Sequence, residues 1–260
     1  MNQSAIFDKP KLWQEYGLTE DYGERIETVR RLMPKDVSSV LDIGCGKGDV
    51  INAIQQDNPS LRTVGMDLSI EALAYVQTHA LSASLPDAPF PAKSFDVVLC
   101  LEVLEHIDEA AYRAARQEIQ RLAGRFIIIG VPFKENLSSK QVICGACKTQ
   151  SHADGHVRSY QERDAAALFE QFTLENRVVT GVAQRREPVA ASRIRQRVAG
   201  VYYQPAIFHC PRCGHDRAAQ FAFHSPLLLR KPASLLNRML RRMKPLEPYW
   251  WIGLYRRQDA

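Results

Sequence analysis

The sequence of 260 residues lacks any apolar run approaching the roughly 20 residues that a helix needs to cross a bilayer. Its first residues, Met1-Asn2-Gln3-Ser4, lead into no apolar signal region. Internal repeats and low-complexity tracts are also missing. We therefore expect a cytoplasmic chain, long enough for one α/β domain with a generous core and additional inserted segments.

Two common nucleotide-binding patterns are absent as well. Glycines 44, 46 and 48 follow the spacing G-x-G-x-G, which fits neither the dinucleotide pattern nor the phosphate loop. The segment Val40–Gly48 nevertheless predicts a buried strand and a glycine turn, with a helix beginning near Asp49. Glycines let the backbone approach a ligand at the carboxyl end of a strand, where open α/β sheets bind small molecules. The pattern indicates a nucleotide-like ligand.

Further along the chain, predicted strands and helices alternate as in a doubly wound sheet. The predicted strands are Leu61–Met66, the apolar run after Phe95, Arg125–Val131 and Phe172–Thr180, and the predicted helices are Glu20–Met33, Ile70–His79, Asp108–Leu122 and Glu162–Gln171. A long segment that begins near Gly181 then precedes the last predicted strand, Tyr249–Tyr255.

The glycine turn, Asp67 at the end of the following strand and the block Ala88–Ile107 together resemble the class I S-adenosylmethionine-dependent methyltransferases, particularly the type 11/12-like members. The resemblance implies a seven-stranded, doubly wound Rossmann-like α/β sheet formed by residues 37–180 and 248–257, with the last strand antiparallel beside Phe172–Thr180. It also implies that S-adenosyl-L-methionine is the cofactor and that Asp67 accepts hydrogen bonds from both ribose hydroxyls. Ser84 stands where the family often has an acid that reaches the adenine amino group. The cofactor-binding residues that it implies are Asp42, Gly44, Cys45, Gly46, Gly48, Asp67, Leu68, Ser84, Leu85, Leu101 and Glu102.

The remaining segments are predicted to surround this domain. Residues 1–36 are expected to form a helical lid over the cofactor. Residues 133–155 and 181–247 are insertions that leave from the carboxyl ends of strands, the edge where ligands bind, and they can meet there. We expect them to form a zinc-binding and basic module on the substrate side.

Four of the six cysteines form two C-x-x-C pairs, Cys144 with Cys147 and Cys210 with Cys213. Four thiolates suit a tetrahedral structural zinc site, and a reducing compartment argues against disulfides. The long separation between the pairs adds little closure entropy. An alternative set is Cys144, Cys147, His152 and His156. Cys45 and Cys100 are expected to serve packing.

His106, His156 and Glu102 are the candidate catalytic residues. In relatives, the turn that contains Glu102 and His106 faces the methyl group, and a histidine equivalent to His156 is expected to approach His106. Methyl transfer is an in-line displacement, which needs a general base only if the acceptor must lose a proton. The family resemblance favours O-methylation of a glycan or a small-molecule acceptor.

Two alternatives to that function remain open. Glu102, Glu105, His106 and His156 also resemble the divalent-metal site of small-RNA 2′-O-methyltransferases, although few aromatic residues interleave the basic ones, which disfavours nucleic acid. The other alternative is a cofactor-binding zinc scaffold that has no catalytic turnover.

The charge is unevenly distributed along the chain. Residues 185–260 contain 15 Lys or Arg and 4 Asp or Glu, whereas residues 1–184 contain 19 and 25. Leu235, Leu236, Met239, Leu240 and Met243 share one helical face, with arginines on the others. This segment is either a membrane-surface helix or a helix packed on its own domain with solvated arginines. An anionic surface, and a location peripheral to the inner membrane, are therefore expectations, while the sequence does not indicate an oligomeric state.

Overall fold

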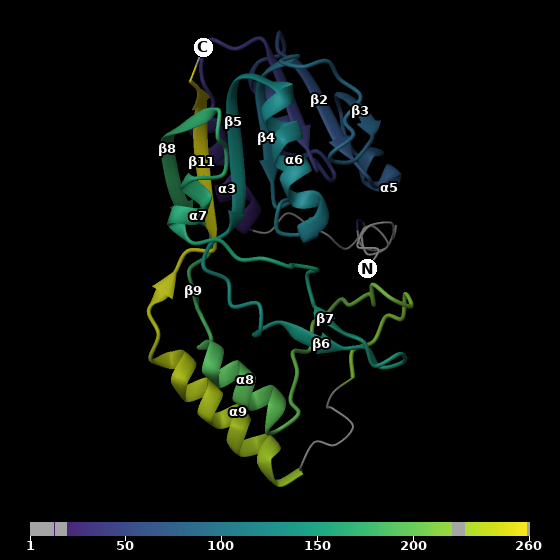
Figure 1. The fold of residues 1–260 in the computed structure, drawn as a ribbon, viewed down its shortest axis with the longest axis vertical. Coiled ribbons are helices and arrows are strands. Elements are labelled where there is room, and N and C mark those ends of the chain that lie inside the picture. Colours follow the sequence, from purple (N-terminus) through teal and green to yellow (C-terminus); the bar gives the residue numbers. More distant parts are fainter. Residues whose placement is uncertain (1–12, 14–19, 220–226, 259–260) are drawn as a thin grey trace. The chain divides into compact units, whose positions relative to one another are not determined.

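The computed structural model describes Trp13 and residues 20–219 and 227–258, which are arranged in two compact units (Figure 1). The sheet unit consists of Phe7–Phe133, Tyr160–Val182 and Tyr249–Ala260. In the described residues, the inserted unit consists of Lys134–Ser159 and Ala183–Pro248. These segments overlap the predicted insertions, residues 133–155 and 181–247. Much of the predicted lid over residues 1–36 lies outside the described residues.

A seven-stranded sheet forms the sheet unit, with the order β3-β2-β1-β4-β5-β11-β8. Every neighbouring pair is parallel except those of β11, which runs antiparallel to both β5 and β8. The predicted doubly wound α/β sheet and its antiparallel closing strand are therefore confirmed. The strands are β1 Ser39–Ile43, β2 Arg62–Asp67, β3 His79–Ser82, β4 Phe95–Leu101, β5 Ala123–Pro132, β8 Phe172–Thr180 and β11 Trp250–Arg257.

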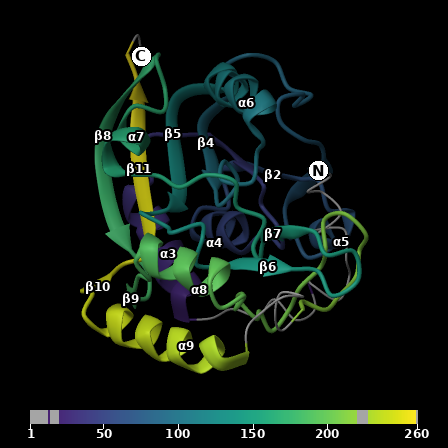
Figure 2. The same ribbon diagram turned by 60° about the horizontal axis from the view of Figure 1, so that its bottom comes forward.

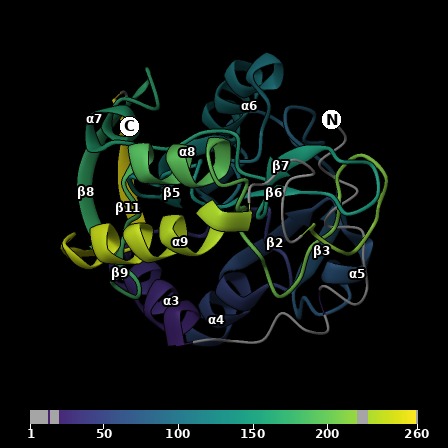
Figure 3. The ribbon, with the colours of Figure 1, turned by 90° about the horizontal axis from the view of Figure 1, so that it is seen from below.

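Alternate strand residues enter two separate hydrophobic cores, one on each face of the sheet. In β4, Val97 and Leu99 belong to the core that includes α3 (Glu20–Leu32) and α4 (Asp49–Asp57). Val98 and Cys100 belong to the core that includes α6 (Glu109–Leu122) and α7 (Glu162–Ala166). Figure 3 shows α3 and α4 on the opposite side of the sheet from α6 and α7. Such two-sided burial explains the near-continuous apolar sequence of the central strands.

Two predicted helices are too long. The helix expected over Ile70–His79 ends at Leu73, as the short helix α5 (Ile70–Leu73), and the chain then forms β3. The Gln77 amide donates to the side chain of Asn52, and the Thr78 hydroxyl lies 2.6 Å from that of Thr63. These tertiary hydrogen bonds favour a parallel strand beside β2 over a continued helix. The helix expected over Glu162–Gln171 likewise ends at Ala166.

The inserted unit contains two short antiparallel strand pairs and one helix pair. Strands β6 (Gln141–Ile143) and β7 (Gln150–His152) form one strand pair, and β9 (Gln184–Arg185) and β10 (Leu246–Glu247) form the other. Helix α8 (Val189–Arg197) packs on α9 (Leu227–Arg242), and Figure 2 shows the two side by side.

Polar contacts join the two sequence segments of this unit. The Asn136 side chain donates to the Glu187 carbonyl and to the Ser192 hydroxyl, both at 2.8 Å. The Arg195 guanidinium is buried, pairs with the Glu187 carboxylate and donates to the Ser139 carbonyl. The segments near residues 134–159 and 183–248 therefore fold as one body.

The chain passes between the two units at points that lie close together in the sheet unit. Phe133, the last residue before the first inserted segment, forms a β-bridge with Tyr160, the first residue after it. The second inserted segment separates Thr180 from Trp250, and these two residues are register partners in the β8–β11 pair. Among the described residues, no helix is both long enough and apolar enough to span a bilayer.

Candidate cofactor site and cysteine cluster

The glycine turn after β1 is held against the end of β2. The amides of Gly44 and Cys45 both donate to the Met66 carbonyl, at 2.7 and 3.1 Å. Gly44 has φ +70°, and a Cβ added there would lie 2.2 Å from a methyl carbon of Val103. Gly46 and Gly48 also have positive φ angles. The turn therefore depends on glycine for both its conformation and its close packing.

Asp67, at the carboxyl end of β2, connects this turn with the next loop. Its Oδ2 atom accepts a hydrogen bond from the Gly46 amide at 2.8 Å, and its Oδ1 atom accepts one from the Ser69 amide at 2.9 Å. These two hydrogen bonds orient the carboxylate between the glycine turn and the loop after β2. The carboxylate therefore joins the end of β2 to the glycine turn after β1.

The predicted adenine-side residues lie along the same edge of the sheet. The Ala83 amide donates to the Asp67 carbonyl at 3.2 Å, and the Ser82 hydroxyl donates to the Leu68 carbonyl at 3.3 Å. The chain segment that continues into Ser84 and Leu85 therefore runs beside Asp67. Leu68 is 48% exposed, which leaves an apolar surface at this point.

Asp42 is a buried carboxyl group near the end of β1. Burial, together with the nearby charge of Asp67, raises the pKa of Asp42 to about 7, and the opposing charge of Arg25 only partly offsets this. Arg25 comes from α3 and is itself buried. The strand that leads into the glycine turn therefore carries a buried titratable acid, on which the charge of Arg25 acts.

The chain turns sharply at the end of β4, where Glu102 has φ +57°. That conformation is uncommon for residues other than glycine and often marks functional positions. The Glu102 amide donates to the Gly130 carbonyl at 2.8 Å, and the His106 amide donates to the Val103 carbonyl at 3.0 Å. Leu101 and Glu105 are buried, whereas Glu102 and His106 are partly exposed. The predicted polar turn thus lies at the ligand-binding edge of the sheet.

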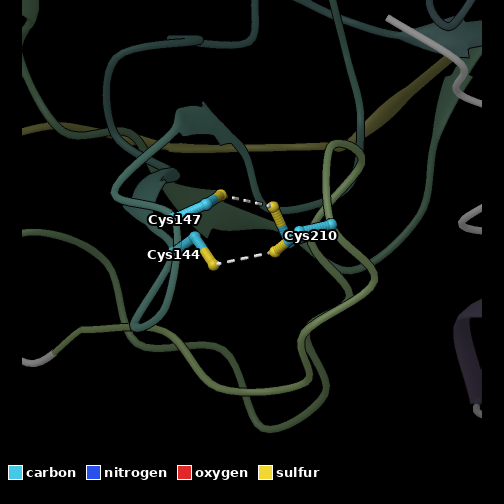
Figure 4. Close-up of side chains that lie close together, drawn as sticks. Cys144, Cys147 and Cys210 are labelled. Carbon is cyan, nitrogen blue, oxygen red and sulfur yellow. Dashed lines mark hydrogen bonds between the residues drawn. The ribbon is translucent and has the colours of Figure 1, made fainter.

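The four cysteines of the two C-x-x-C pairs lie together in the inserted unit, and each Sγ atom lies within 4.8 Å of the others. Cys144 Sγ is 3.7 Å from Cys213 Sγ, and Cys147 Sγ is 3.5 Å from Cys210 Sγ. Figure 4 shows Cys144 and Cys147 on one chain segment and Cys210 on the segment opposite. Sulfurs bound tetrahedrally to zinc at about 2.3 Å are roughly 3.8 Å apart, so the cluster has a suitable size for the ion.

The surroundings of these thiols also suit a metal. The hydrogen bonds with the Thr149 hydroxyl and backbone lower the pKa of Cys147 to about 6, which favours the thiolate that metals bind. Burial raises the pKa of Cys210 to about 12, and a bound cation would oppose that effect. Cys45 lies in the glycine turn and Cys100 in the sheet core, as the packing interpretation predicts.

The alternative ligand set of Cys144, Cys147, His152 and His156 does not form. Instead, the rings of His152 and His156 stack with their centroids 4.9 Å apart, and both lie close to Glu135 and Asp154. His156 Nδ1 lies 2.5 Å from the Glu135 carboxylate. Although burial opposes ionisation, the hydrogen bond and charge of His156 lower the pKa of Glu135 overall. The histidines therefore belong to a buried polar cluster separate from the cysteines.

Comparison with known proteins identifies the domain that contains the glycine turn. Residues 40–124, from β1 through α6, match the family model described as a methyltransferase domain. This match covers less than half of the chain, and it supports the predicted resemblance to the S-adenosylmethionine-dependent methyltransferases. A Pyrococcus horikoshii OT3 protein has a similar fold, with a TM-score of 0.54 and 15% identity over 92% of both chains. A SAM-dependent methyltransferase from Archaeoglobus fulgidus has a TM-score of 0.50 and 14% identity, over 90% of this chain and 93% of that one.

The curated relatives are similar over a shorter region. A ubiquinone biosynthesis O-methyltransferase from Albidiferax ferrireducens is 34% identical over 98 residues, which is 34% of this chain and 38% of the relative. The match to a second protein of that name, from Paracidovorax citrulli, covers 40% of the relative. The chain thus spans about two fifths of the length of the curated relatives that it matches.

Three residues near the glycine turn were not predicted. Trp13 lies over it, since a Cβ added to Gly46 would be 3.3 Å from the indole ring. Arg25 acts on Asp42, and Val103 fills the space that Gly44 leaves. None of these contacts follows a local motif. In the Glu20–Met33 helix, Arg25 lies between Tyr22 and Val29 of the apolar face, and this was the one signal that could have drawn attention to it. His156 lies in the other unit, so its predicted approach to His106 stays a prediction.

Proposed function

We propose that this protein transfers the methyl group of S-adenosylmethionine to a hydroxyl oxygen of a small molecule or glycan. The observation that carries the proposal is the hydrogen bond between Asp67 and the Gly46 amide, which joins the acidic strand end to the glycine turn. The curated relatives are named O-methyltransferases, which supports oxygen as the acceptor atom. When bound, the cofactor would supply a methyl group on a positively charged sulfur.

The protein's own residues would bind and orient the two reactants. Asp67 would accept hydrogen bonds from the ribose hydroxyls, and Leu68 with Leu85 would contact the adenine. The glycines would allow the methionine portion to approach the backbone, near Glu102. Because methyl transfer requires an in-line approach, alignment and exclusion of water would supply most of the rate enhancement.

A hydroxyl acceptor must also lose its proton, and His106 and His156 are the candidate general bases, with Glu102 as a positioning residue. Replacing each histidine with alanine should lower the rate with an acceptor of high pKa more than with one of low pKa. An equal loss for both acceptors would assign the histidine to orientation rather than to proton transfer.

We also propose a structural zinc ion in the cluster of Cys144, Cys147, Cys210 and Cys213. Four thiolates form a closed tetrahedral shell with no position for a reacting water. The ion would therefore join the two sequence segments of the inserted unit rather than take part in methyl transfer.

The test has a binding stage and a turnover stage. Calorimetry should detect S-adenosylhomocysteine binding to the full chain, and Asp67→Ala should abolish it. Tight binding of NADH or ATP in its place would contradict the proposal. Incubation with methyl-labelled S-adenosylmethionine and fractionated lysate should then place label on small molecules or glycans. Label in RNA would favour the RNA methyltransferase alternative, and binding without any product would favour the scaffold alternative.

A further inference from the structure

The helix pair of the inserted unit exposes large apolar side chains beside arginines. On α9 and just after it, Leu235 and Met239 are each 58% exposed and Met243 is 80% exposed. These positions are four residues apart, so they share one helix face. Arg238 and Arg242 are exposed next to this face. The surface therefore offers an apolar face and a basic flank to the same partner.

Helix α8 has the same composition on its outer side. Ile194 and Val198, at its C-terminal end, are 48% and 50% exposed, and Arg193 and Arg197 are exposed at the neighbouring positions. In contrast, Arg195 is buried and paired with Glu187. The exposed arginines are thus available to a partner, while the buried one maintains the fold of the unit.

Charge complementarity restricts what this surface can bind. Neither α8 nor α9 contains an acidic residue, whereas together they contain eight Lys or Arg. An anionic partner is favoured electrostatically. Nucleic acid would satisfy the arginines, but it would leave Leu235, Met239 and Met243 without an apolar environment, and no aromatic residue occurs in either helix for base stacking.

We propose that the surface formed by α8 and α9 docks on an anionic lipid bilayer. Amphipathic helices of this kind lie in the interface, with apolar side chains among the acyl chains and arginines near the headgroups. Here Leu235, Met239 and Met243 enter the bilayer, and Arg238 and Arg242 contact anionic headgroups. The proposal concerns attachment to a membrane and stands independently of the acceptor that is methylated.

Vesicle sedimentation with the full chain tests this proposal. At low salt, the protein should sediment with vesicles of phosphatidylcholine and phosphatidylglycerol, and much less with phosphatidylcholine alone. The double variant Arg238→Gln with Arg242→Gln should bind the anionic vesicles roughly 10- to 30-fold more weakly. The matched control is Lys35→Gln with Arg113→Gln, which removes the same charge from exposed positions of the sheet unit and should bind like wild type.

A second variant separates membrane docking from simple anion binding. Leu235→Gln with Met239→Gln leaves the charge unchanged and should reduce vesicle binding at least tenfold, because the apolar face is lost. Binding of S-adenosylhomocysteine at the wild-type affinity shows that each variant is folded. The proposal is wrong if wild type stays in the supernatant with anionic vesicles, or if the two α9 double variants bind as wild type does. It is also wrong if filter binding retains RNA while vesicles retain no protein.

Discussion

The Asp67 carboxylate lies 2.8 Å from the Gly46 amide nitrogen, so the end of β2 directly supports the turn after β1. Two neighbouring parallel strands thereby present an acid and a bare backbone at the same edge of the sheet. This is the place where open α/β sheets bind nucleotides. The proposed cofactor site is therefore organised by the protein's own hydrogen bonds.

Substitution of Asp67 by asparagine should weaken binding of S-adenosylhomocysteine. The variant loses charge-assisted hydrogen bonds to the ribose, each worth about 1.5–3 kcal/mol, so the dissociation constant should rise roughly 10- to 100-fold. Calorimetry measures the change. Asp87→Asn, which removes a nearby exposed carboxylate, is the control and should bind normally. Equal affinities for wild type and Asp67→Asn would contradict the assigned role.

Gly44→Ala should destabilise the sheet unit. The new Cβ would lie 2.2 Å from a Val103 methyl carbon, on a backbone with φ +70°. Overpacking and backbone strain together should lower the free energy of unfolding by about 2–5 kcal/mol. Urea denaturation measures this loss.

Two further variants test the cause of that loss. In Gly44→Ala with Val103→Ala, the second substitution removes the clashing methyl, so the added loss relative to Val103→Ala alone should be smaller. Gly23→Ala, in α3, meets nothing within 4 Å and should instead stabilise the protein by roughly 0.5–1 kcal/mol. A similar loss at both glycines would indicate that packing against Val103 is not the reason.

Asp42 should make stability depend on pH. Burial raises its folded pKa to about 7, from an ordinary value of 3.8. The folded state therefore holds a proton that the unfolded state releases, and stability falls as pH rises from about 4 to about 7. Relative to Asp42→Asn, wild type should lose up to about 4 kcal/mol over this range. Urea denaturation at pH 4 and pH 8 measures the difference, and a gap between the two proteins that does not change with pH would contradict the shift.

Metal analysis should find one equivalent of zinc per purified chain, and Cys213→Ser should lose it because three thiolates no longer close the shell. A chelator should lower the unfolding temperature of wild type but not that of the variant, since metal binding contributes to folding. Cys45→Ser, which changes a thiol of the glycine turn, should retain zinc. Absence of zinc from wild type purified without chelator would rule out the site.

The sheet was predictable because its signals are local. The strand at Val40–Ile43 is buried on both faces, so its sequence is almost continuously apolar, and the glycines that follow are required by backbone geometry. The strand β3 was missed, since three of its four residues are exposed and the fourth is a partly buried leucine. Its conformation depends on Thr63 and Asn52, which are distant in sequence.

The candidate site was predictable only in part, for the same reason. Gly44 and Asp67 follow two predicted strands, whereas Trp13, which lies beside Gly46, and Arg25, whose charge acts on Asp42, come from segments with no recognisable spacing. The cysteine pairs predicted a metal site. His152 lies beside Glu135 rather than beside the cysteines, and the sequence did not single out Glu135.

The bridge between Phe133 and Tyr160 and the pairing of Thr180 with Trp250 have an evolutionary consequence. Each inserted segment begins and ends beside paired residues of the sheet unit, so a tight turn could replace either segment without altering the strand order. The inserted unit could thus be exchanged in evolution while the sheet unit keeps its strand order. Chimeras that graft the inserted unit onto a shorter homologue should therefore fold.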